Sequence, residues 1–195
     1  MPTGTRLILA SSSPRRQAFL NQLGIRFRIA VPDIDEQPRR GESPYAYARR
    51  AARDKARAVA ARVGGGPVIV AADTIVVLGR TILGKPKHAA DARRMLKLLS
   101  GRDHKVITGV CALRGTKMRN FAVSTDVVFK ELTGREIGFY VKSGEPMDKA
   151  GAYAIQGIGS FLVRAIRGSY TNVVGLPVAE LLDVLERDFG MKIPR

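Results

Sequence analysis

Residues 9–16, Leu-Ala-Ser-Ser-Ser-Pro-Arg-Arg, bring hydroxyl and guanidinium groups to the expected start of a helix. Ser13 suits the N-cap and Pro14 the first helical position. The free N–H groups and the positive dipole end of a helix attract anions, and arginine binds phosphate oxygens strongly. An ordinary capped helix with exposed arginines is the alternative. The residues that we expect to bind phosphate are Ser11, Ser12, Arg15 and Arg16.

Asp73 interrupts the most apolar run of the chain, residues 68–77. A carboxylate inside such a strand is costly unless it is paired, bound to a metal or placed at a cleft. Beside a phosphate site, this acid can hold Mg²⁺ or orient an attacking water molecule, and we favour that role over a cap on a chain bend. Asp35 and Glu36, in a polar loop, offer a second carboxylate for a metal, or are simply exposed.

Two lysines are further candidates for contact with phosphate. Lys55 lies at the border of the apolar stripe of a predicted helix, so its ammonium can reach a cleft or extend into solvent. Lys85 follows Gly79 and Gly84 with the spacing of a Walker A motif, but Pro86 stands where that motif needs Ser or Thr. The match is therefore false, although Lys85 can still contact phosphate as a point charge from a loop.

Short apolar runs alternate with helical patterns along the chain, which predicts an α/β fold. No compositional break divides the chain, so we expect one domain over residues 1–195. The expected strands are 6–10, 26–31, 68–78, 81–83, 105–113, 121–129 and 161–166, with 81–83 paired to the preceding strand and 105–113 paired to 121–129. The expected helices run from Pro14 to just before Gly24, over 44–62 with Tyr45, Ala48, Ala52, Ala56 and Val59 on the apolar face, over 89–99, from a Thr133–Glu136 capping box to about Lys142, and from Pro177 onward.

The composition limits the possible functions. The chain has 33 Lys and Arg against 17 Asp and Glu, a net charge of +16, so it should attract polyanions, nucleic acid and nucleotides among them. It shows no pattern of a dedicated nucleic-acid-binding fold, no secretory signal and no membrane span. Cys111 lies in an apolar run, and we expect it to be a buried thiol in a strand. His88 and His104 have no second histidine or cysteine at zinc-ligand spacing. We therefore expect a cytoplasmic protein.

Taken together, ten short motifs resemble those of the Maf family of nucleotide pyrophosphatases, in family order and over nearly the whole chain. They begin with the serine–arginine run at 11–16 and end with Gly-Ser-Tyr-Thr-Asn-Val-Val-Gly-Leu-Pro at 168–177. The motifs between them lie at 35–36, 55–56, 72–74, 84–86, 108–110, 144–146, 148–151 and 155–157. The resemblance implies a mixed twisted sheet with flanking helices, in two lobes around a groove, similar to the inosine triphosphatase architecture. It also implies Mg²⁺ or Mn²⁺ dependence and, commonly, a homodimer.

The resemblance also assigns roles to individual residues. Asp73 matches the proposed proton acceptor, and Glu36, Lys55 and Lys85 match residues of the phosphate and metal site. The positions associated with base selection carry Arg15, Thr74 and Gln156, the set of the branch that acts on dTTP and UTP. The resemblance therefore implies hydrolysis of dTTP and UTP to monophosphate and pyrophosphate, in a house-cleaning role. The alternatives are a basic nucleic-acid-binding protein and a division-regulating protein without catalysis, the latter suggested by the family's naming for septum formation.

Overall fold

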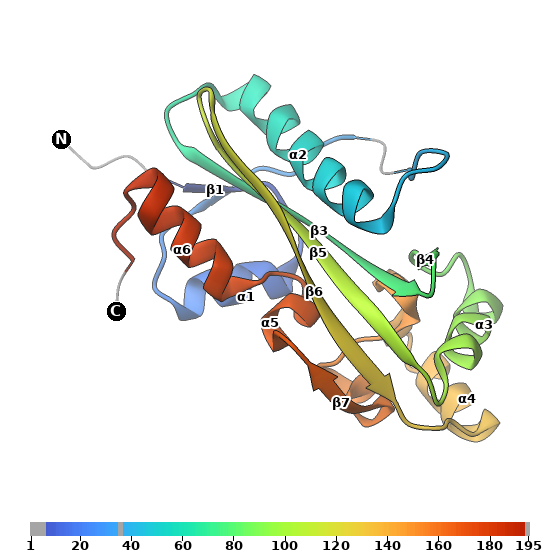
Figure 1. Cartoon of the computed structure of the whole chain (residues 1–195). Coiled ribbons are helices and arrows are strands. Elements are labelled where there is room, and N and C mark those ends of the chain that lie inside the picture. The colour runs from blue at the N-terminus through green and yellow to red at the C-terminus, as the bar shows by residue number, and fades with distance from the viewer. Residues whose placement is uncertain (1–6, 35–36, 194–195) are drawn as a thin grey trace. The chain divides into compact units, whose positions relative to one another are not determined.

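The computed structural model describes residues 7–34 and 37–193. The chain forms two compact units. The first unit consists of Met1–Asp73, Thr108–Val123 and Gly175–Arg195, and the second of Thr74–Ile107 and Ser124–Val174. Three long strands, β3 (Val68–Leu78), β5 (Asp103–Arg114) and β6 (Lys117–Phe129), each contribute residues to both units (Figure 1).

Within the described residues, the strands form a seven-stranded sheet in the order β2-β1-β3-β5-β6-β7, with β4 paired to β3. The strand β1 (Leu7–Leu9) runs parallel to β2 (Arg28–Ile29) and to β3. By contrast, β4 (Thr81–Leu83) and β7 (Val163–Arg167) pair antiparallel with β3 and β6. The predicted α/β fold with a mixed sheet and flanking helices is confirmed.

In the first unit, alternate residues of the strands face opposite sides of the sheet, as the pleat requires. The odd-numbered residues of β1 pack in a core with α1 (Pro14–Gln22) and α6 (Val178–Phe189). The even-numbered residue Ile8 packs in a second core with α2 (Pro44–Val63). Helices therefore cover both faces of this part of the sheet (Figure 1), which explains why β1 and the first five residues of β3 are apolar without interruption.

Local sequence signals set the helix ends of the first unit. The Ser43 side chain accepts a hydrogen bond from the backbone N–H of Ala46 at 3.2 Å, which caps α2. The helix α1 begins at Pro14 as predicted, and the chain leaves it at Gly24 with a φ of 66°. Ser13 occupies the predicted N-cap position, although its side chain makes no capping hydrogen bond with the described backbone.

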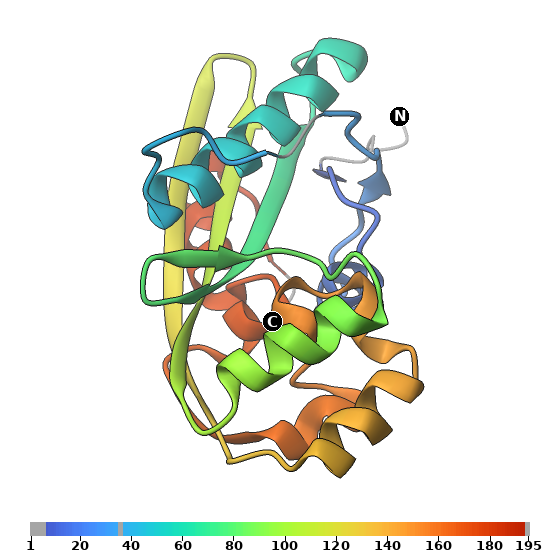
Figure 2. The same ribbon diagram turned by 90° about the vertical axis from the view of Figure 1, so that its right-hand side faces the viewer.

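The core of the second unit lies between its strands and the helices α3 (Ala89–Leu99) and α4 (Gly134–Lys142), which lie side by side (Figure 2). The predicted capping box begins α4: Thr133 Oγ1 accepts from the Glu136 N–H at 3.2 Å, and the Glu136 carboxylate accepts from the Thr133 N–H at 2.8 Å. The glycine-rich segment after α4 forms short 3₁₀ helices at Glu145–Asp148, Ala150–Ala152 and Gly157–Leu162. No helix in the described part of the chain has the length and hydrophobicity needed to cross a bilayer.

The structure corrects the sequence prediction at several places. Tyr45 was predicted on the apolar face of α2, but it is 45% exposed. Tyr47 lies on the buried stripe instead, because residues 47, 51, 55 and 59 share one face at helical spacing. The helix α5 (Tyr170–Val174) was not predicted, since five residues are too few to show a period. The second strand was predicted too long, because only Arg28–Ile29 pair with β1.

His104 is a buried titratable group in the core of the second unit. Its Nε2 lies 2.8 Å from the Tyr153 hydroxyl, and its ring packs edge-on against Phe129 and Tyr153 at centroid distances of 4.9 and 5.3 Å. Burial disfavours the imidazolium and lowers the pKa of His104 from 6.5 to about 4. The folded protein therefore keeps His104 neutral at pH values where the unfolded chain already protonates it.

We expect the free energy of unfolding to decrease as the pH falls from about 6.5 towards 4, because only the unfolded state binds this proton. The pKa difference corresponds to about 3 kcal/mol at the acid end. Urea denaturation of the wild type and of His104→Gln at about pH 7.5 and about pH 4.5 measures the effect. Glutamine stays polar but does not titrate, so the variant should lose less stability on acidification. An identical loss in both proteins would contradict the prediction.

Candidate active site

Lys55 and Asp73 form a buried ion pair in the first unit. Lys55 Nζ lies 2.6 Å from Asp73 Oδ1, and each residue is only 7% exposed. Burying either charge alone would cost several kcal/mol, and the pairing offsets that cost. Asp73 is therefore paired, which is one of the three arrangements expected for an acid inside an apolar strand. The predicted position of Lys55 at the buried stripe of its helix is confirmed.

The strand and helix periods bring these two side chains together. Ile69 and Ala71 of β3 pack in the core that contains α2, so Asp73, two residues further along, points to the same side of the sheet. Lys55 lies on the buried stripe of α2, one turn after Ala51. The pair therefore follows from two local patterns that meet at one place.

The helix α2 packs closely on β5 at Gly109. A Cβ atom at this position would lie 2.1 Å from the carbonyl oxygen of Ala48 and 2.3 Å from its carbonyl carbon. Both contacts involve backbone atoms, so no side-chain movement can relieve them. The absence of a side chain at Gly109 thus allows α2 to lie at the depth at which Lys55 reaches Asp73.

Arg16 connects the loop before α1 to the segment before α6. Its Nε donates to the Gly175 carbonyl at 2.7 Å, and its Nη1 donates to Ser11 Oγ at 3.0 Å. Ser11 Oγ also accepts from the Ser13 N–H at 3.2 Å. Arg16 therefore fixes the shape of this loop in addition to any contact with phosphate. The two remaining predicted phosphate ligands of this segment differ in burial, since Ser12 is exposed and Arg15 is half-buried.

The second unit carries the other described residues of the predicted site. Thr74 directly follows Asp73 in β3 and is half-buried. Lys85 is exposed in the segment after β4, and the preceding carbonyl, that of Gly84, accepts from the Gly151 N–H at 3.0 Å. The strand at Thr81–Leu83 confirms that the Walker A match is false. Gln156 is exposed, with an extended backbone (φ −97°, ψ 160°).

The donor set for a metal is described only in part, because Asp35 and Glu36 lie outside the described residues. Within residues 7–34 and 37–193, no three His, Cys, Asp or Glu side chains lie together as a metal-binding group. Asp73 offers carboxylate oxygens, which Mg²⁺ and Mn²⁺ prefer, and Mg²⁺ is usually held by one or two carboxylates together with substrate phosphates. This donor therefore fits a divalent metal that binds together with a phosphorylated ligand.

Two findings concern residues outside the predicted site. Cys111 is buried in β5, which confirms the predicted strand thiol, and desolvation raises the pKa of this thiol to about 12. Glu145, which has no role among the sequence predictions, accepts hydrogen bonds on its carboxylate from Tyr140, Ile158 and Gly159. Two of these partners lie 13 and 14 residues away, so no local spacing could identify them.

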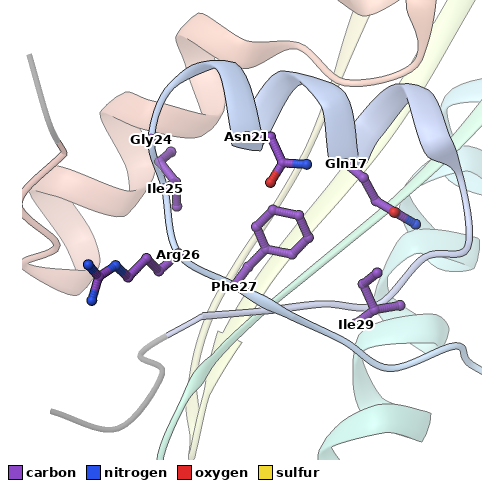
Figure 3. Close-up of a pocket in the computed structure, with 7 residues that line it drawn as sticks. All are labelled: Gln17, Asn21, Gly24, Ile25, Arg26, Phe27 and Ile29. Atoms are coloured by element: carbon purple, nitrogen blue, oxygen red, sulfur yellow. The ribbon is translucent and has the colours of Figure 1, made fainter. Parts of the chain in front are cut away.

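An open hollow in the first unit lies beside the second half of α1 (Figure 3). The amide side chains of Gln17 and Asn21 and the ring of Phe27 face it, and the other lining residues are Gly24, Ile25, Arg26 and Ile29. The lining contains no acid that could hold a metal or accept a proton, and none of the predicted site residues. The hollow is therefore not the candidate active site.

Comparison with known proteins gives consistent matches over most of the chain. The sequence model of the family described as "Maf-like protein" matches residues 6–188. A "dTTP/UTP pyrophosphatase" of Myxococcus xanthus (strain DK1622) is 53% identical over 190 residues, which cover 97% of this chain and 95% of that protein. A protein of the same name from Anaeromyxobacter dehalogenans (strain 2CP-C) is 52% identical over 193 residues, 97% of this chain and 96% of that protein. A solved structure of a nucleoside-triphosphatase, a dITP/XTP pyrophosphatase from Mycobacterium abscessus, aligns over 94% of each chain with a TM-score of 0.45 and 15% identity.

Proposed function

Because this chain belongs to the Maf family, and because relatives that share about half of its residues are named dTTP/UTP pyrophosphatases, we propose that it hydrolyses dTTP and UTP to the nucleoside monophosphate and pyrophosphate. The structural observation that carries the proposal is the buried Lys55–Asp73 pair. It supplies a fixed acid with a cation beside it, which is what water activation next to a phosphate requires.

Several residues of this chain would take part in the reaction, each in a different role. Asp73 accepts a proton from the water molecule whose oxygen attacks the α-phosphorus. The bond between that phosphorus and the oxygen that bridges to the β-phosphate then breaks, and pyrophosphate leaves. Lys55 holds Asp73 in place, and Lys85 offsets negative charge on the phosphates. Arg15, Arg16, Ser11 and Ser12 are the further groups that we propose to hold the triphosphate.

A divalent cation, Mg²⁺ or Mn²⁺, is part of the proposal. Asp73 and Glu36 would hold it, and it would supply positive charge that polarises the phosphate under attack. The oxygen chemistry of Asp73 supports this assignment, and Glu36 is proposed from the family resemblance alone. Activity should therefore be lost in excess chelator and restored by either metal.

Base selection is proposed to rest on Arg15, Thr74 and Gln156. A glutamine amide donates and accepts hydrogen bonds at once, which matches the N–H donor and carbonyl acceptor on the imide edge of uracil and thymine. A carboxylate at this position could only accept. Modified pyrimidines that keep the imide edge should therefore also be substrates.

The proposal is tested by identifying the products and the bond that breaks. Purified protein with Mg²⁺ or Mn²⁺ should convert dTTP to dTMP and pyrophosphate. When the reaction runs in ¹⁸O-labelled water, the label should appear in dTMP, because water attacks the α-phosphorus. Release of orthophosphate and dTDP, or label in the pyrophosphate, would contradict the proposed bond specificity.

We also propose that the protein acts in the cytoplasm as a homodimer that removes unwanted nucleotides. The proposal for the compartment rests on Cys111, the single cysteine, being buried and unavailable for a disulfide. The dimer rests on the family resemblance and is tested by light scattering during gel filtration. A link to cell-division arrest is tested by comparing the phenotypes of cells that overproduce the wild type and an inactive Asp73 variant.

A further inference from the structure

We infer that Glu145 is a positioning residue that fixes the loop carrying Gln156, and so determines how much the thymine or uracil base contributes to substrate recognition. The inference rests on the proposed role of Gln156 in reading the base. The observations behind it all lie within the second unit.

The Glu145 carboxylate holds the backbone on the C-terminal side of Gln156. Glu145 Oε2 accepts a hydrogen bond from the Ile158 N–H at 2.9 Å, and Oε1 accepts one from the Gly159 N–H at 3.0 Å. Hydrogen bonds to a carboxylate are among the stronger ones in proteins. Two successive amides after Gly157 are thus tied to one side chain.

Tyr140 holds the backbone on the N-terminal side of Gln156 and is itself tied to Glu145. Its hydroxyl accepts from the Ala154 N–H at 3.1 Å and donates to Glu145 Oε1 at 2.9 Å. Tyr140 is fully buried in α4, so its hydroxyl has a fixed position. The Glu145–Tyr140 pair therefore fixes the loop on both sides of Gln156.

The glycines of the loop allow this close approach. Gly157 has a φ of 72°, and a Cβ there would lie 2.8 Å from Glu145 Oε2. A Cβ at Gly159 would lie 2.4 Å from the Ala154 carbonyl oxygen and 2.5 Å from the Tyr140 hydroxyl oxygen. The backbone can wrap around the two anchoring side chains only because both positions lack a side chain.

This arrangement matters for recognition because Gln156 is exposed and extended between the anchored residues. An exposed glutamine pays an entropy cost when it is ordered by a ligand, and a fixed backbone lowers that cost. A displacement of about 1 Å can reduce a rate about 100-fold. Loss of the Glu145 contacts should therefore weaken the contribution of the base to substrate recognition and leave the rate of triphosphate hydrolysis without a base unchanged.

The test compares Glu145→Gln with the wild type on dTTP and on deoxyribose 5-triphosphate, which lacks a base. Glutamine keeps the size of Glu145 but has a single acceptor oxygen, so at least one of the three hydrogen bonds is lost. We expect the ratio of kcat/KM for dTTP to that for the base-free triphosphate to fall about 10- to 100-fold. The base-free rate should stay within about twofold of the wild type. Glu131→Gln, which removes an exposed acid of the same unit, serves as the matched control and should leave both rates unchanged.

Three further variants and one physical measurement complete the test. Gln156→Ala should lower the same ratio, Glu145→Gln/Gln156→Ala should lower it no further, and Tyr140→Phe should lower it as well. Amide hydrogen exchange should show lost protection at Ile158, at Gly159 or at both in Glu145→Gln. An equal fall in both rates, or unchanged protection at these amides, would overturn the inference.

The outcomes also separate this inference from the proposed function. If Gln156→Ala leaves the ratio unchanged, the proposed reading of the base is wrong, and Glu145 is then at most a structural anchor. If the wild type releases no pyrophosphate from any nucleotide, the proposed hydrolysis is wrong. Amide exchange then still decides whether Glu145 fixes the loop.

Discussion

Asp73→Asn is expected to lower kcat for dTTP hydrolysis by about 10²- to 10⁴-fold, the usual contribution of a general base. Asparagine keeps the size of the side chain and can still accept a hydrogen bond from Lys55. The variant should therefore fold, although with lower stability, because the buried Lys55 ammonium loses its counter-charge. Asparagine cannot take a proton from water, and it is a weaker ligand for a divalent cation. Steady-state release of pyrophosphate measures the effect, and circular dichroism checks the fold.

A second acid provides the matched control for this prediction. Asp126 accepts a hydrogen bond from Lys105 at 2.6 Å, the same distance as in the Lys55–Asp73 pair, but both side chains are far more exposed. Asp126→Asn should keep kcat within about twofold of the wild type. Should Asp73→Asn behave like this control, Asp73 would have no part in the reaction.

Lys55→Met is expected to destabilise the protein by about 3–5 kcal/mol at neutral pH, because it leaves the buried Asp73 carboxylate without its cation. Methionine replaces most of the lysine stem, so packing changes little and the loss reports mainly on charge. Urea denaturation gives the free energy of unfolding, and activity should also be lost.

The double variant Lys55→Met/Asp73→Asn separates the roles of the pair in stability and in catalysis. Removing the carboxylate charge should recover a large part of the stability that Lys55→Met loses, while activity stays absent. Destabilisation that simply adds up from the two single variants would mean that the residues are not coupled. The buried ion pair would then contribute nothing specific to the fold.

Local patterns explain which parts of the molecule could be predicted. The strand β3, its turn into β4 and the helix α3 have the predicted bounds, because each shows its own period and its own end signals within a few residues. The same holds for the capping box at Thr133. The position of Lys55 at the buried stripe of α2 was predictable because it depends only on the helical period, whereas its burial also depends on Asp73.

Contacts between distant segments explain what could not be predicted. The carbonyl that Arg16 binds, that of Gly175, lies 159 residues further along the chain. The missing capping bond of Ser13 and the contacts of Glu145 likewise depend on how the backbone folds back on itself. The pattern of neighbouring residues contains no signal for such contacts. The assignment of Glu36 to the metal site stays a prediction, because this residue lies outside the described part of the chain.

The close approach of Gly109 to Ala48 has a consequence for the evolution of this sequence. A mutation that adds even a methyl group at 109 pushes against the backbone of α2, and the helix carries Lys55 with it. Descendants that retain the acid and its lysine should therefore also retain glycine at 109, a position that has no reactive group of its own. Selection for the chemistry would in this way extend to a residue that takes no part in it.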